Sequence, residues 1–307
     1  MYSIPNEQTN GGIYDKVTTV ECYGDSITQG MGYENYPEKT YPGQLNTMLG
    51  NKYTVSNGGV PSEKTFTIMT RQGALSLFTS KDFSFAKGES TITIGNRNDN
   101  GFIDSNGVLT DYIYYLGNQL SINDITIDGE KYTIIVEDFV WSPTRSCTFK
   151  LKRYDTSSAL TIPQGTPVTL NNTTGPDSCN IYLMGANGHY ISTDDLIAQF
   201  KTMVDYHGSN NYLIVIPFTN TNYDKKFYEA FGDHCVSFRQ AAITYGLEFE
   251  GITPTQADKD KIAEGLVPPS LCLNNTYDVH LNEKGYNLLA TLLHQQGQQI
   301  GIFDTNS

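Results

Sequence analysis

Two short runs of almost continuous apolar residues constrain the fold of this chain more than any other feature. They occupy residues 181–184 and 212–216. Strands of a parallel sheet are buried on both faces and therefore show such runs. Between them, a start signal at 192–195 and an apolar stripe at helical spacing predict a helix over 193–206. Strand, helix and strand in this order indicate an α/β fold with a parallel sheet.

The N-terminal part shows the same alternation. Residues 17–23 form a β-rich run that ends in Gly24. A helix is expected to begin at Tyr41-Pro42, with proline in its first turn, and to stop at Gly50. A second short strand over 53–56 is expected to break at Asn57-Gly58-Gly59.

Two further helices are expected near the C-terminus. A long one is predicted over 223–245. The last begins after Asn282, which is a suitable cap, and Leu281 and Tyr286 stand where a hydrophobic staple would pack. Together with the runs above, they predict that residues 1–74 and 178–307 form one α/β unit.

The middle of the chain, residues 75–177, has a different texture. Runs of β-formers such as 90–94 and 132–136 are separated by turn signals, and no helical period is evident. We therefore expect an inserted β-rich module here, which is a candidate carbohydrate-binding module.

Composition excludes several classes of function. The 307-residue chain has a net charge of -13, which argues against binding to nucleic acid. Its five cysteines include no CxxC pair, so buried free thiols are expected, with a Cys147–Cys179 disulfide as the alternative. No apolar stretch is long enough for a membrane span, and no signal peptide is visible at residues 1–7. No HExxH motif or His/Asp cluster indicates a metal cofactor.

Four short loops carry residues suited to nucleophilic catalysis. Ser26 follows the first strand in a Gly-Asp-Ser turn, and Gly59 and Asn187 follow two other predicted strands. His280 immediately precedes the last helix. The carboxyl ends of parallel strands share one edge of the sheet, where α/β folds bind ligands. These loops are therefore expected to converge.

In these residues the chain resembles the SGNH hydrolases, also called the GDSL esterase/lipase family. The resemblance covers both α/β stretches, roughly 200 residues, and leaves the β-rich module unmatched. It implies a flavodoxin-like three-layer α/β/α core interrupted by the module. The matching motifs are Gly24-Asp25-Ser26-Ile27-Thr28, the Tyr41-Pro42 helix through Leu49-Gly50, Gly59, Gly185 with Asn187, and His280 with Asn282, Gly285 and Tyr286.

The resemblance implies a serine carboxylic-ester hydrolase without a cofactor. Ser26 is the implied nucleophile and His280 its general base. The implied oxyanion hole consists of the backbone N–H groups of Ser26 and Gly59 and the side-chain amide of Asn187.

The chain departs from the family pattern at two positions. Tyr277 stands three residues before the histidine, where the family usually has an acid, and the nearest acid is Asp278. Either Asp278 orients His280, or a backbone carbonyl does so and the enzyme works as a dyad. In a third alternative, Asp278 merely faces solvent. Gly188 replaces an aspartate that is not one of the core catalytic groups.

The favoured substrate is an acetylated polysaccharide, because the sequence is rich in Asn, Tyr and Thr and carries the β-rich module. Tyr112, Tyr114 and Trp141 of the module, with His189, are candidate sugar-binding residues. Related domains with inserted β modules occur among polysaccharide deacetylases, including those of bacteriophage tail spikes, so an extracellular or virion location is favoured. A lipase or thioesterase, and a non-catalytic glycan-binding module, are the alternatives.

Overall fold

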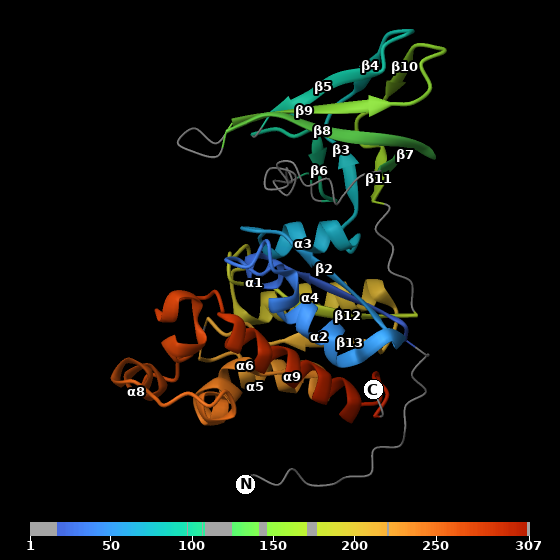
Figure 1. Ribbon diagram of the computed structural model, residues 1–307. Coiled ribbons are helices and arrows are strands. Elements are labelled where there is room, and N and C mark those ends of the chain that lie inside the picture. The colour runs from blue at the N-terminus through green and yellow to red at the C-terminus, as the bar shows by residue number, and fades with distance from the viewer. Residues whose placement is uncertain are drawn as a thin grey trace.

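The structure is mixed α/β and contains a parallel sheet with helices on both faces (Figure 1). It is a computed structural model that describes residues 17–96, 98–105, 107, 125–140, 146–170, 177–219 and 221–305. In these ranges five strands form the parallel sheet in the order β14-β13-β12-β1-β2. Their bounds are β1 Thr19–Gly24, β2 Thr54–Gly59, β12 Ser178–Leu183, β13 Tyr212–Val215 and β14 Cys235–Val236.

The helices lie almost entirely outside the middle part of the chain. The α-helices of the described ranges are α1 Ser26–Gln29, α2 Tyr41–Leu49, α3 Thr65–Gln72, α4 Thr193–His207, α5 Asp224–Phe231, α6 Phe238–Ala241, α7 Leu247–Phe249, α8 Gln256–Ala263 and α9 Glu283–Gln299.

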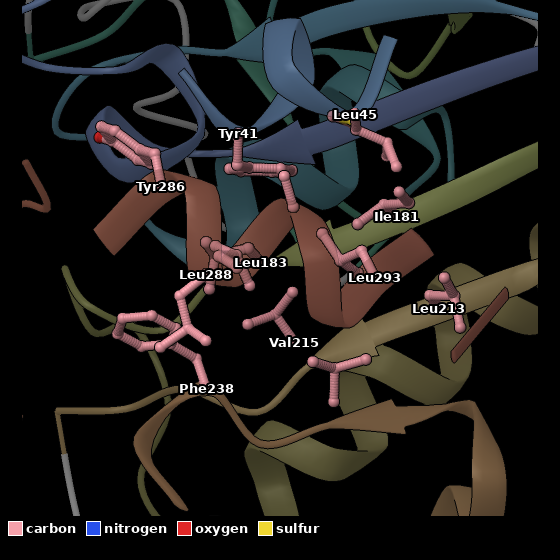
Figure 2. Packing of buried hydrophobic residues seen from close by; sticks show 14 of the residues in the cluster. Tyr41, Leu45, Ile181, Leu183, Leu213, Val215, Phe238, Tyr286, Leu288 and Leu293 are labelled. Carbon is pink, nitrogen blue, oxygen red and sulfur yellow. The ribbon is translucent and has the colours of Figure 1, made fainter. Parts of the chain in front are cut away.

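Helices pack on both faces of the parallel sheet and bury its inner strands. On one face, α2 and α9 place Leu45 and Leu293 over Ile181 and Leu213 (Figure 2). On the other face, residues of α3, α4 and α5 pack against the strands, with Phe200 among them. Every residue of β12 and β13 is buried, as the continuous apolar runs predict.

Between α3 and β12, the strands of the described residues are antiparallel. In the described ranges, seven of them form a sheet in the order β5-β9-β8-β7-β11-β3-β6, and β10 pairs with β4. Their apolar side chains form a separate cluster, which we refer to with its strands as the β module. The bounds are β3 Leu77–Thr79, β4 Phe83–Phe85, β5 Thr91–Asn96, β6 Phe102–Ile103, β7 Ile125–Ile127, β8 Glu130–Val140, β9 Ser146–Arg153, β10 Leu160–Ile162 and β11 Pro167–Leu170.

Register brings three strand ends together at one edge of the parallel sheet. Gly24, the last residue of β1, lies opposite Gly59 of β2 and Leu183 of β12. The loops that continue from these strands therefore start side by side. Ser26 comes two residues after Gly24, and Asn187 four residues after Leu183.

Two local predictions are wrong. The helix expected over 223–245 ends at Phe231, because Gly232 adopts a positive φ of 56° and Cys235–Val236 then joins the sheet beside β13. The strand expected to break at Asn57 instead continues through Gly59, paired with β1.

All five cysteines are free and buried, so the predicted free thiols are confirmed. Within the described ranges, no helix combines the length and apolarity needed to cross a bilayer.

Candidate active site

Ser26 lies in the first turn of α1, which begins two residues after the end of β1. The Asp25 carboxylate caps this helix by accepting a hydrogen bond of 2.9 Å from the Ile27 N–H. The turn requires glycine at position 24, because a Cβ atom there would lie 2.0 Å from the Thr28 hydroxyl. N–H groups in a first turn have no partner within the helix. The Ser26 N–H is therefore available to a ligand at the sheet edge.

His280 reaches Ser26 from the loop before α9. The Ser26 Oγ atom lies 2.9 Å from His280 Nε2. The histidine backbone is fixed by its carbonyl, which accepts a hydrogen bond of 2.9 Å from the Leu273 N–H. Two residues later, Asn282 caps α9 by accepting a bond of 3.0 Å from Gly285. A strand end and a helix start thus hold the two side chains in contact.

The other ring nitrogen of His280 faces Asp278. The distance from His280 Nδ1 to Asp278 Oδ1 is 3.2 Å, and the same oxygen accepts hydrogen bonds from the Val279 and His280 N–H groups. Burial acts to raise the pKa of Asp278, but these N–H groups and the neighbouring imidazole outweigh it and lower the pKa. At this position the structure has a carboxylate and not a backbone carbonyl, although the acid is only two residues from the histidine.

Gly59 lies close to the turn that carries Ser26. Its N–H donates a hydrogen bond of 3.0 Å to Asn57 Oδ1, while Asn57 Nδ2 donates to the Gln29 carbonyl. A Cβ atom at Gly59 would lie 2.0 Å from the Gln29 nitrogen, so the two segments can approach only with glycine here. The next residue, Val60, packs into the apolar cluster of the β module.

The side-chain amide of Asn187 is held by two hydrogen-bond acceptors near Ser26. Its Nδ2 atom donates a hydrogen bond of 2.9 Å to the Glu63 carbonyl and one of 3.3 Å to Asp25 Oδ2. The amide therefore belongs to the same cluster as Ser26 and Gly59. A reacting oxygen would exchange with the longer of the two contacts.

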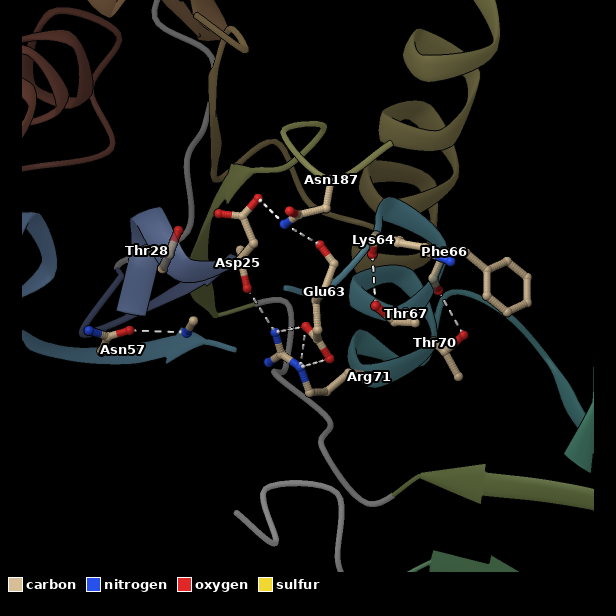
Figure 3. A network of polar contacts seen from close by, with 12 residues as sticks. Asp25, Thr28, Asn57, Glu63, Lys64, Phe66, Thr67, Thr70, Arg71 and Asn187 are labelled. Carbon is tan, nitrogen blue, oxygen red and sulfur yellow. Dashed lines mark hydrogen bonds and ion pairs between the residues drawn. The ribbon is translucent and has the colours of Figure 1, made fainter. Parts of the chain in front are cut away.

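A buried ion pair supports this arrangement. Arg71 of α3 and Glu63 have side chains that are 3% and 0% exposed, and Arg71 Nη2 lies 2.8 Å from Glu63 Oε2 (Figure 3). The same guanidinium nitrogen donates to the Gly24 carbonyl at 3.3 Å. Arg71 thus connects the end of β1 to the segment whose carbonyl holds Asn187.

Asp25 is a buried carboxyl within this network. Burial raises its pKa to about 7, the Ile27 N–H opposes that shift, and the negative charge of Glu63 adds to it. A carboxyl in this environment changes its protonation state near neutral pH.

The sequence-predicted sugar-binding residues have different outcomes. His189 lies two residues beyond Asn187, with its ring centroid 4.9 Å from that of Phe66. Tyr112, Tyr114 and Trp141 lie outside the described residues. In the described part of the chain, no cluster of three or more His, Cys, Asp or Glu side chains could hold a metal ion.

Sequence reasoning missed Glu63 and Arg71. Charged residues are rarely fully buried unless they are paired, and two such residues eight positions apart resemble any solvated pair in a sequence. In the sequence, this buried pair therefore looks the same as an exposed pair of charged residues.

No family model, curated protein or solved structure matches this chain.

Proposed function

We propose that this protein is a serine esterase that forms an acyl-serine intermediate. The observation that carries the proposal is the continuous contact from Asp278 through His280 to Ser26, with 3.2 Å and 2.9 Å between the atoms. A hydrogen bond from Nδ1–H to the Asp278 carboxylate leaves the Nε2 lone pair facing the Ser26 hydroxyl. This is the tautomer that a general base needs.

The reaction follows from these positions. His280 Nε2 takes the Ser26 proton as Oγ attacks the ester carbonyl carbon. When the tetrahedral intermediate collapses, the C–O bond to the alcohol breaks and imidazolium returns the proton to the leaving oxygen. A water molecule, deprotonated by the same imidazole, then attacks the acyl carbon. The bond from that carbon to Ser26 Oγ breaks, imidazolium returns the proton to Oγ, and the acid is released.

The oxyanion is proposed to bind between three donors. They are the N–H groups of Ser26 and Gly59 and the Nδ2 atom of Asn187. The Gly59 N–H would exchange its hydrogen bond of 3.0 Å to Asn57 Oδ1 for the oxyanion. Losing one donor of this kind costs about 3–4 kcal/mol of transition-state stabilisation. The buried pair of Glu63 and Arg71 supports the geometry, since it fixes the carbonyl that orients Asn187.

The order of the strands supports the same site. Numbered along the chain within the parallel sheet, the order is 2-1-3-4-5, which is the flavodoxin-like arrangement. Ligands bind where such an order reverses, between the first and third strands. Here these are β1 and β12, which lead to Ser26 and Asn187. The finer assignment to a flavodoxin-like SGNH hydrolase core is part of the proposal.

The substrate is proposed to be an O-acetyl group on a polysaccharide. The β module contacts the catalytic edge through Val60, so a glycan chain has a second surface beside the ester. The test measures hydrolysis of nitrophenyl acetate and acetate release from acetylated polysaccharides by the wild type and Ser26→Ala. Turnover lost in Ser26→Ala supports the esterase, and turnover that survives this substitution rules it out.

A further inference from the structure

A groove lies where α3, α4 and the loop after β12 meet the β module. We name it the junction groove. Its volume is about 490 Å³. The residues used below are Phe66 on α3, His189 and Ile191 in the loop, Asp195 and Gln199 on α4, and Asp104 just after β6.

The junction groove begins beside the proposed oxyanion hole. Glu63 holds Asn187 through its carbonyl, and two residues later the Thr65 hydroxyl donates to the carbonyls of Gly188 and His189 at 3.3 Å and 3.2 Å. The two segments therefore run together from Asn187 to the groove. Two residues of chain span at most about 7 Å, so the groove wall starts within reach of a sugar next to the esterified one.

One wall of the junction groove is a pair of rings. The His189 and Phe66 rings are tilted by 47°, with 4.9 Å between their centroids. His189 adopts a φ of +76°, a left-handed conformation that costs a non-glycine residue about 1 kcal/mol or more. Its carbonyl is held by Gln199 Nε2 at 3.0 Å. The surrounding contacts thus keep a strained residue whose ring faces Phe66.

The lining of the junction groove also includes two aspartates whose carboxyl groups can accept hydrogen bonds. Asp195 accepts one from the Ile191 N–H, which leaves it further acceptor capacity, and the carboxyl group of Asp104 lies at the same groove. Hydroxyl groups are the natural donors to such a set. An acyl chain would leave these oxygens buried against methylene groups, at a cost.

The charge of the junction groove limits its ligand further. Among the described residues that line it there is no Lys or Arg, while two are aspartates. Carboxylates disfavour a ligand that carries negative charge in the same space. A net charge of -13 on the chain acts in the same direction.

We propose that the junction groove binds a neutral sugar residue of the polysaccharide whose ester reaches Ser26, an inference that rests on the proposed function. The sugar places an apolar face on Phe66 and His189 and donates hydroxyl hydrogen bonds to the two aspartates. The groove thereby selects the glycan, and the catalytic edge selects the ester.

The test compares Phe66→Ala with Phe249→Ala, a truncation of an exposed phenylalanine on α7 outside the groove. For each, kcat/KM is measured on acetylated xylan, acetylated glucomannan and nitrophenyl acetate. The ratio of polysaccharide to nitrophenyl ester activity should fall about tenfold in Phe66→Ala through a raised KM, and stay at the wild-type value in Phe249→Ala. An unchanged ratio in Phe66→Ala overturns the proposal.

A binding measurement separates a lost subsite from a misfolded variant. Deacetylated xylo- and manno-oligosaccharides are titrated calorimetrically into Ser26→Ala, with and without Phe66→Ala, after circular dichroism has shown that both are folded. Binding by the first protein and loss of binding in the second support the subsite. Equal binding by both overturns it.

Four further outcomes are decisive. A preference for acetylated pectin over the neutral polymers, or a shift in acyl-chain preference in Phe66→Ala, overturns the neutral-sugar assignment. Ser26-dependent turnover of nitrophenyl acetate with no effect at Phe66 overturns the groove and leaves the esterase standing. If the esterase proposal itself is wrong, turnover of nitrophenyl acetate survives in Ser26→Ala.

Discussion

The parallel sheet and the β module bury their strands in different ways. All six residues of β12 are buried, whereas buried residues of β9 mostly alternate with partly or fully exposed ones. A strand covered on both faces can present chemistry only at its ends, while an antiparallel strand can present a whole face. This explains why Ser26 and Asn187 follow the ends of β1 and β12; Gly59 is itself the last residue of the less buried edge strand β2. The β module contributes the apolar side chains that pack with Val60, and it contributes Asp104 to the lining of the junction groove.

The largest expected effect is at the sheet edge. His280→Ala should lower kcat by about 10⁴-fold, because Ser26 loses its base. Asp278→Asn should cost about 10²-fold, since the carboxylate is 41% exposed and water can partly replace it. The control is Asp304→Asn, an exposed aspartate paired with Lys52, which should retain wild-type kcat. Wild-type kcat in Asp278→Asn would show that another group orients the base.

The next largest effect is expected at the buried ion pair of Arg71 and Glu63. Arg71→Met leaves Glu63 unpaired and should destabilise the fold by about 3–5 kcal/mol. It should also lower kcat at least tenfold with little change in KM, because the carbonyl that holds Asn187 loses its support. Unfolding by urea and kinetics on nitrophenyl acetate measure the two effects.

A second buried pair provides the matched control for Arg71. Arg239 contacts Asp224, and its other partners are the carbonyls of Thr221 and Gly265. Arg239→Met should lose comparable stability and keep kcat near the wild-type value. Equal losses of kcat in the two variants would mean that Arg71 acts through stability alone.

The protonation of Asp25 should make stability depend on pH. Its pKa is about 7 in the folded protein, above the value of about 3.9 for an unfolded chain. Between these values the folded state binds a proton that the unfolded state lacks, so stability falls as pH rises, by up to about 4 kcal/mol.

Asp25→Asn tests this pH dependence because it removes the titrating group. The free energy of unfolding, measured with urea, should decrease less from pH 5 to pH 8 in Asp25→Asn than in the wild type. Asp304→Asn should show the wild-type decrease. A wild-type slope in Asp25→Asn would place the titration on another group. The lowered pKa of Asp278 acts in the opposite sense and below pH 4, outside this range.

The smallest effect is expected where the β module touches the edge. Val60→Ala should cost about 2 kcal/mol of stability and lower kcat a few-fold, because Val60 positions the neighbouring Gly59. Val168→Ala removes the same groups from the same cluster on β11, away from Gly59, and should change stability without changing kcat. Identical kinetics in both variants would show that the module does not support the site.

Much of the fold was predictable because β12 and β13 are buried on both faces. The runs at 181–184 and 212–216 and the cap at Asn282 gave correct elements, since each depends on local pattern. The helix over 223–245 was wrong because a buried edge strand of two residues, Cys235–Val236, is too short to show its own period. Pairing with β13 decided its conformation.

The candidate site was predictable only in part. Ser26, Gly59, Asn187 and His280 stand at strand ends or a helix start, so topology alone predicts that they converge. The partner of His280 Nδ1 depends on how the loop at 277–280 bends, and a sequence leaves that open. Glu63 and Arg71 depend on burial of charge, which arises from tertiary packing and has no local signal.

The most direct test of the central claim is covalent labelling by a fluorophosphonate, which reacts with an activated serine. Mass spectrometry of the digested protein should find one equivalent of phosphonate on the peptide that contains Ser26. His280→Ala should slow labelling by orders of magnitude, and Ser84→Ala, at an exposed serine of β4 in the module, should label like the wild type. Labelling elsewhere, or none on a protein that hydrolyses esters, would contradict the assignment of Ser26 as the nucleophile.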